Sequence, residues 1–188
     1  MITVEQIRAV LSGRERREIH NPSLRPAGVL ILLFPKGGEL CFLLTRRTQD
    51  VEHHKGQISF PGGSKDQEDR DIVETALRET EEEIGLPRTR VQVLGLFDDY
   101  ETPTGFAITP VVAHIPELPQ LRVNASEVTE ILEVPVALFT DEANERVEQR
   151  QVRGKLYDVY FYRYGNHEVW GATAAMIRAF LRALRANA

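Results

Sequence analysis

The alternation of apolar and polar positions along the chain predicts a sheet built from several strands. An apolar, β-branched run at residues 27–34 is typical of a buried strand. Turn residues at 35–38 separate it from a second strand at 39–45, so we expect a hairpin. The same patterns predict further strands at residues 91–100, 107–115, 127–134 and 156–164.

Helical patterns occur at about residues 4–19, 69–84, 135–139 and 172–184. Gly85 follows the second of these segments, and we expect it to end that helix in the left-handed conformation. The last segment is amphipathic, with Arg178, Arg182 and Arg185 on its polar side. One helix between strands and another after them predict an α/β fold, in which a mixed sheet lies between helices.

Length and charge narrow the class of protein. A chain of 188 residues with 42% hydrophobic residues fills one core, so we expect a helical extension at 1–24 and a single domain at 25–188. A net charge of −5 argues against general nucleic-acid binding. The single cysteine, Cys41, excludes an internal disulfide and a multi-cysteine zinc site. Without a signal-peptide pattern or a run of ~20 apolar residues, a cytoplasmic protein with no membrane partner is expected.

The segment from 76 to 86 carries the most informative chemistry. At about 100° per residue, Glu79 and Glu83 stack one turn apart at the edge of the apolar stripe, and Glu82 lies about 60° further out. Like charges placed there repel each other and lose hydration, which a cation between them would offset. The alternative to a cation site is that these glutamates form an ordinary acidic face that is exposed to solvent. Gly62–Gly63, just upstream, allows a ligand to approach the backbone and favours the cation.

The run Arg-Glu-Thr-Glu-Glu-Glu-Ile-Gly-Leu at 78–86 resembles the second half of the Nudix box. The first half differs in two respects. Five residues after Gly63 lead to Asp69, where the family has glutamate. Eight residues rather than seven then separate Asp69 from Arg78. The runs at 43–47, 54–66 and 169–174 resemble the coenzyme A diphosphatases of this family. The likeness extends over roughly residues 25 to 180.

This resemblance implies an α/β/α sandwich around a mixed sheet. It also implies hydrolysis, dependent on Mg²⁺ or Mn²⁺, of the diphosphate of coenzyme A, with its thioesters as further substrates, to 3′,5′-ADP and 4′-phosphopantetheine. Glu79, Glu82 and Glu83 would hold the metal, with the carbonyl of Gly63 as a further ligand in the family, and Arg78 would hold the carboxylates in place. The general base would be a box glutamate, for which Glu82 is the first choice, or a glutamate of a later loop, for which Glu127 is the candidate.

A 3′-phosphate on the substrate calls for a basic contact, and the nearest cations are Arg46, Arg47, Lys55 and Lys65. Neighbouring residues of a strand face opposite ways, so we expect only one of the two arginines to reach the ligand. Imidazole does not suit an oxygen-rich Mg²⁺ site, so His53 and His54 are not expected to bind the metal. The expected substrate-binding residues are Arg47, Lys55, Gly56, Gln57, Gly62 and Gly63.

Two alternative functions remain open. The same chemistry could act on ADP-ribose, NADH or another dinucleotide, or the domain could bind nucleotides without catalysis. Aromatic residues at 157 and 160–162 could stack on an adenine, although the alternating pattern favours core packing for them. In every case the expected partner is a small molecule, and the protein is expected to be a monomer or a homodimer.

Overall fold

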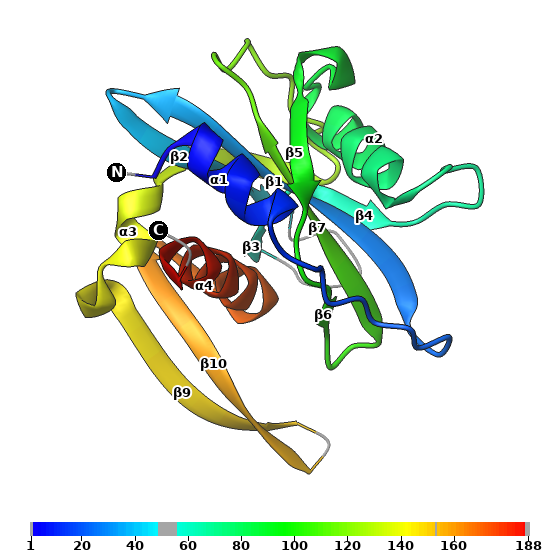
Figure 1. Ribbon diagram of the computed structural model, residues 1–188, viewed down its shortest axis with the longest axis vertical. Coiled ribbons are helices and arrows are strands. Elements are labelled where there is room, and N and C mark those ends of the chain that lie inside the picture. The colour runs from blue at the N-terminus through cyan, green and yellow to red at the C-terminus, as the bar shows by residue number, and fades with distance from the viewer. Residues whose placement is uncertain (1, 49–55, 153, 187–188) are drawn as a thin grey trace.

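The computed structural model describes residues 2–48, 56–152 and 154–186 (Figure 1). The helices are α1 (Val4–Ser12), α2 (Ile72–Ile84), α3 (Val136–Thr140) and α4 (Gly171–Ala186), with 3-10 turns η1 (Arg88–Arg90) and η2 (Glu142–Asn144). The strands are β1 (Arg25–Lys36), β2 (Glu39–Arg47), β3 (Ile58–Ser59), β4 (Gly62–Ser64), β5 (Gln92–Leu96), β6 (Tyr100–Glu101), β7 (Phe106–His114), β8 (Val128–Pro135), β9 (Glu145–Val152), β10 (Lys155–Tyr164) and β11 (His167–Trp170).

In the described part of the chain, eight strands form one mixed sheet with the central order β3-β2-β1-β7-β5. Strand β1 runs parallel to β7, with Arg25 opposite Phe106, and antiparallel to β2 and β4. Strands β8 and β6 extend the sheet by pairing with β2 and β7. Strands β9, β10 and β11 form a separate antiparallel sheet. The predicted mixed α/β architecture is confirmed.

Helices cover both faces of the central sheet (Figure 1). Side chains of β1 alternate between two cores, because Ile31 packs in the cluster that contains α1 and α4, while Leu30 packs in the cluster that contains α2. This two-sided burial explains why residues 27–34 of β1 are apolar without interruption. Ile7 of α1 and Phe180 of α4 share one core, so the N-terminal helix packs directly on the domain.

The first helix ends at Ser12, so the expectation of a helix to residue 19 is wrong. Residues 14–19 are instead held by two aspartates that lie between β5 and β6. Arg14 Nη2 binds both carboxylate oxygens of Asp98 at 2.7 and 2.8 Å, and Arg16 Nη2 binds Asp99 at 2.7 Å. These ion pairs join residues more than 80 positions apart, and such partners outweigh local helix propensity.

Other differences concern strands and the last helix. The single strand expected at 91–100 is two strands, β5 and β6, and the segment between them holds the aspartates that bind residues 14–17. Strands β9 and β11 were not expected, because neither carries a clear apolar alternation and both depend on pairing with β10. Arg178 is partly buried rather than solvated, since its guanidinium lies 4.1 Å from the ring centroid of Tyr160.

None of the described helices is both long and apolar enough to span a membrane.

Candidate active site

Helix α2 carries the acidic residues, and its ends follow from local sequence. Asp71 caps the N-terminus, where its carboxylate accepts a hydrogen bond from the backbone N–H of Glu74 at 2.8 Å. Gly85 ends the helix in the left-handed conformation with φ of 66°, as predicted. The helix therefore begins at Ile72 rather than at residue 69, and Asp69 lies in the connection that precedes it.

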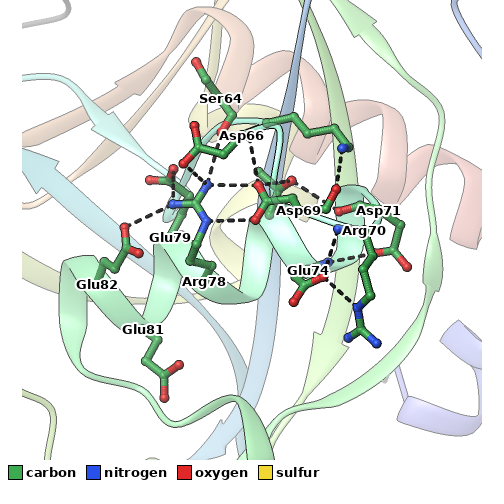
Figure 2. A network of polar contacts seen from close by, with 12 residues as sticks. Ser64, Asp66, Asp69, Arg70, Asp71, Glu74, Arg78, Glu79, Glu81 and Glu82 are labelled. Carbon is green, nitrogen blue, oxygen red and sulfur yellow. Dashed lines mark hydrogen bonds and ion pairs between the residues drawn. The ribbon is translucent and has the colours of Figure 1, made fainter.

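Asp69 is the main partner of Arg78 (Figure 2). The guanidinium donates from Nε and Nη2 to the two carboxylate oxygens, at 2.9 and 3.0 Å. Thr75 Oγ1 and the N–H of Asp66 also donate to this carboxylate, each at 2.9 Å. The hydrogen bonds from Arg78 hold the pKa of the buried Asp69 carboxyl well below its usual range. Aspartate at this position therefore anchors the arginine.

Arg78 was expected to orient the box glutamates by forked hydrogen bonds, but its fork is used on Asp69. The remaining nitrogen, Nη1, lies 2.9 Å from a carboxylate oxygen of Glu79 and 3.1 Å from one of Glu82 (Figure 2). Arg78 therefore fixes these two side chains, and within the described residues it makes no ion pair with Glu83. The hydrogen bonds to Asp69 raise the pKa of Arg78, which stays charged.

Glu83 is the most deeply buried carboxylate of α2, with 2% of the residue exposed. Its Oε2 accepts a hydrogen bond from the N–H of Gly62 at 3.3 Å, and Nη1 of Arg47 lies 3.6 Å from Oε1. Burial raises the pKa of Glu83 to about 8, against the smaller opposing effect of Arg47. Burial also raises the pKa of Glu79, whose carboxylate is partly enclosed. Both groups are thus held where ionisation is unfavourable without a further positive charge.

The glycine pair of β4 is required by two different contacts. Gly62 has φ of 149°, and a Cβ there would lie 2.3 Å from the carbonyl oxygen of Gly28 in β1. At Gly63, a Cβ would lie 2.4 Å from the carboxyl carbon of Glu79. The first glycine allows β4 to pair with β1, and the second leaves space for the glutamate.

Replacing Gly63 by alanine is expected to lower turnover while the fold persists. The new methyl group would push the Glu79 carboxylate aside, and a displacement of about 1 Å in an active site can cost ~100-fold in rate. The thermal unfolding midpoint should stay close to that of the wild type, because the clash is with the end of a flexible side chain.

The neighbouring substitution provides the contrast. Gly62→Ala would clash with the backbone of β1 at a left-handed φ, so we expect a loss of about 2–3 kcal/mol in unfolding free energy. Calorimetry and kinetics on both variants separate the two roles. A Gly63→Ala enzyme with unchanged kcat would show that the position of Glu79 does not matter.

A third carboxylate comes from the segment before β8. The carbonyl of Glu127 accepts from the N–H of Thr48 at 2.9 Å, and Asn124 Nδ2 donates to its side-chain Oε1 at 3.1 Å. The charge of Glu127 contributes to the raised pKa values of Glu79 and Glu83, so the three carboxylates lie around one region. Thr48 and Asn124 were not selected as site residues from the sequence, although Asn-Ala-Ser-Glu is a recognisable turn pattern.

Glu82 is the most exposed of the three box glutamates. Its side chain is 54% exposed, and its carboxylate shares Nη1 of Arg78 with Glu79, whose pKa the charge of Glu82 helps to raise. Within the described residues, no group of three or more histidine, cysteine, aspartate or glutamate side chains is close enough to hold a metal ion. The donor set of Glu79 and Glu83 nonetheless fits a hard divalent cation, because it consists of carboxylate oxygens whose loss of hydration outweighs the opposing charges of Arg78 and Arg47.

The basic residues near this region separate as expected from strand geometry. Arg46 lies 3.8 Å from Glu130, whereas Arg47 faces Glu83. Lys65 donates to the carbonyl of Asp69 at 2.6 Å, so it supports the connection before α2.

The remaining expected substrate residues lie at the end of β2 or outside the described chain. The N–H of Arg47 donates to the carbonyl of Gln57, and the N–H of Gly56 donates to the carbonyl of Thr48. These bonds place Gln57 and Gly56 beside the end of β2. Lys55, His53 and His54 lie outside the described residues. Of the aromatic residues, Phe161 and Tyr162 are buried as expected, whereas Tyr157 is exposed.

Comparison with known proteins gives a consistent result. Residues 24–153 match the NUDIX domain. A Photorhabdus laumondii protein named uncharacterized Nudix hydrolase NudL is 39% identical over 153 residues, which make up 81% of each chain. A NudL relative from Escherichia coli O1:K1 / APEC is 35% identical, covering 87% of this chain and 85% of its own.

Among solved structures, the fold is similar to that of the MutT protein from Methanosarcina mazei Go1, with a TM-score of 0.55 and 18% identity over 90% of this chain and 99% of that one. The Nudix hydrolase RenU from M. smegmatis has a TM-score of 0.53 and 25% identity, over 62% of this chain and 74% of its own. The likeness to the MutT protein concerns the fold alone.

Proposed function

This chain belongs to the Nudix family, and on that premise we propose that it hydrolyses the diphosphate linkage of coenzyme A to 3′,5′-ADP and 4′-phosphopantetheine, and that of coenzyme A thioesters to 3′,5′-ADP and the acylated 4′-phosphopantetheine. Nudix hydrolases act on phosphorus anhydrides of small molecules such as nucleotide derivatives, and generally need divalent metal ions. The observation that carries the proposal is the pair formed by the partly buried Glu79 and the buried Glu83 beside the glycines of β4, with Arg47 next to Glu83. The run at 54–66 supports coenzyme A as the substrate.

Glu79 and Glu83 would hold Mg²⁺ or Mn²⁺, as their burial and raised pKa values favour. A bound divalent cation offsets the negative charge of a diphosphate and lowers the pKa of the attacking water. Arg78 keeps the Glu79 carboxylate oriented through Nη1, while Asp69 fixes the guanidinium itself. Arg47 lies beside Glu83, where its guanidinium can bind a phosphate oxygen of the substrate.

For the general base we favour Glu127 over Glu82. Glu82 is bound to Arg78 at 3.1 Å, and more than half of its side chain faces solvent. Glu127 carries its charge close to Glu79 and Glu83 and has a neutral amide as its hydrogen-bond donor. Its carboxylate would accept a proton from the attacking water during attack on phosphorus. Glu82 keeps its proposed role as a further metal ligand.

Cation binding is expected to strengthen with pH and to release protons. In the metal-free protein Glu83 has a pKa of about 8, so a proton occupies this carboxylate at neutral pH and competes with the cation. The affinity for Mn²⁺ should therefore rise by up to about tenfold per pH unit below that pKa. Calorimetric titrations in buffers of different ionisation enthalpy measure both effects. An affinity that is constant between pH 6 and pH 8 would contradict the assignment of Glu83.

The substrate is tested by comparing kcat/KM for coenzyme A, 3′-dephospho-coenzyme A, ADP-ribose and NADH with Mg²⁺. One charge-assisted contact to the 3′-phosphate should favour coenzyme A over its dephospho form by about 10- to 100-fold. Faster cleavage of the dephospho form would overturn the 3′-phosphate contact. Faster cleavage of ADP-ribose or NADH would assign a different dinucleotide, and no cleavage at all would favour a nucleotide-binding domain.

A further inference from the structure

We propose that Asn124 is a positioning residue, which holds one oxygen of the Glu127 carboxylate so that the other faces the reacting water. This inference rests on the proposed function, in which Glu127 accepts a proton. It concerns the segment 122–128, which lies after β7 and leads into β8, and whose backbone is hydrogen-bonded to the end of α2.

The backbone of this segment is fixed to the end of α2. Asn124 donates its N–H to the carbonyl oxygen of Glu83 at 2.8 Å, and Arg122 donates to that of Ile84 at 2.9 Å. The last carbonyls of a helix have no partner within it, so these bonds satisfy groups that would otherwise be unpaired. Asn124 is thereby attached to the same residue whose side chain would hold the cation.

The side chain of Asn124 is fixed in one orientation by its neighbours. Its Oδ1 accepts from both the backbone N–H and the Oγ hydroxyl of Ser126, at 3.2 and 2.7 Å. Only the oxygen of an amide can accept from a backbone N–H, so the other end must present Nδ2 as a donor. Nδ2 then lies 3.1 Å from Oε1 of Glu127.

An ordinary turn does not need this last bond. In a capping box the glutamate would return to the backbone N–H of the residue three positions earlier. Here that N–H, on Asn124, is already used by the carbonyl of Glu83. The turn is closed by Oδ1, which accepts from Ser126, and by the Asn124 carbonyl, which accepts from the N–H groups of Glu127 and Val128. The bond from Nδ2 therefore orients the glutamate without being needed for the fold of the segment.

The chemistry of the donor suits a base. An arginine or lysine in this place would stabilise the charged carboxylate strongly and lower its affinity for a proton. A neutral amide holds the carboxylate at one oxygen without placing a positive charge beside it. Among the described residues, Oε2 of Glu127 accepts no hydrogen bond, so this second oxygen is available to the water.

Two substitutions separate positioning from folding. Asn124→Asp keeps the acceptor that forms the turn with Ser126 but loses the Nδ2 donor, and Asn124→Ala loses both without adding charge. For both variants we expect kcat with coenzyme A and Mg²⁺ to fall by about 10- to 100-fold, with KM changed less than about threefold. Asn144 offers the matched control, because its Nδ2 donates to the carbonyl of Leu138 in another turn. Asn144→Asp should keep the kcat of the wild type.

A double-mutant cycle tests whether Asn124 acts through Glu127. In a Glu127→Gln enzyme, adding Asn124→Ala should change kcat by less than about twofold, because the base is already lost. Additive losses would overturn the proposal, as would an Asn124→Asp enzyme with the kcat of the wild type.

A crystal structure of metal-free Asn124→Ala gives a readout that does not depend on activity. We expect the Glu127 carboxylate to leave its position while the backbone of 122–128 stays in place. A carboxylate that remains in place would contradict the role of Asn124. A wild-type protein that cleaves none of the diphosphates tested would instead contradict the proposed function, while the crystal structure would still decide whether Asn124 holds the carboxylate.

Discussion

Replacing either Glu79 or Glu83 by glutamine is expected to lower kcat for diphosphate hydrolysis by about 1000-fold or more, since charge stabilisation by a metal ion contributes several kcal/mol. Glutamine has nearly the same shape as glutamate but lacks the negative charge that holds a cation. Gly63 leaves space for the side chain at position 79, and the N–H of Gly62 donates to the side chain at position 83. Glutamine can keep both arrangements, so the lower kcat would reflect the lost charge and not a change of geometry. Initial rates at saturating Mg²⁺ give the measurement.

The metal-free Glu83→Gln variant should be more stable than the wild type, although its activity is lower. Its carboxylate is buried and its pKa is raised to about 8, so the metal-free fold is stabilised below the unfolded pKa and loses this stability as the pH rises through 8. Glu83→Gln removes this penalty, and at pH 8 the metal-free variant should unfold at a higher temperature than the wild type. Loss of activity therefore would not reflect loss of the fold.

The same helix supplies the control. Glu81 binds Arg88 at 2.9 Å on the outer side of α2, so Glu81→Gln should leave kcat unchanged. Near-normal turnover of Glu79→Gln and Glu83→Gln at saturating Mg²⁺ would show that neither glutamate is needed to hold the metal.

Loss of the Asp69 carboxylate is expected to produce the largest change in stability. In Asp69→Ala, the guanidinium of Arg78 and the hydroxyl of Thr75 lose the acceptor that they share, and breaking such a buried pair typically costs about 3–5 kcal/mol. For a protein of this size that corresponds to a fall of roughly 10 °C in the unfolding midpoint. The matched control is Asp66→Ala, because Asp66 is exposed and lies 3.4 Å from the same guanidinium. It should cost less than about 1 kcal/mol.

The pH dependence of unfolding identifies the same carboxylate. The folded pKa of Asp69 lies below its unfolded value of about 3.9, so its contribution is present above pH 4 and is lost as the pH falls. Urea unfolding between pH 2.5 and pH 6 should show a smaller loss on acidification for Asp69→Asn than for the wild type. Parallel curves for the two proteins would show that the ion pair does not stabilise the fold.

Features with a strong local pattern were predictable from the sequence. The strand β1 and the helix α2 were recognised because their apolar periodicity is long, and Gly85 was recognised because a left-handed cap favours glycine. The positions of Glu79 and Glu83 at the edge of the buried stripe also followed from helix geometry, although the structure buries Glu83 more deeply than an edge position indicates.

Features that depend on distant partners were not predictable. The segment 14–19 is held by Asp98 and Asp99, and no local pattern in a charged run indicates which carboxylates it will meet. The sequence likewise led us to connect Arg78 with the box glutamates, whereas its fork binds Asp69 nine residues earlier. The position of Glu127 near α2 depends on backbone bonds of the intervening segment, which leave no mark on the sequence.

The most direct test of the central claim is mass spectrometry of the products formed from coenzyme A, Mg²⁺ and the protein in ¹⁸O-labelled water. Hydrolysis of the diphosphate predicts 3′,5′-ADP and 4′-phosphopantetheine in equal amounts, with one ¹⁸O atom in one of the two new phosphate groups. Intact coenzyme A after incubation with a folded protein that has bound the cation, or cleavage at any other bond, would contradict it.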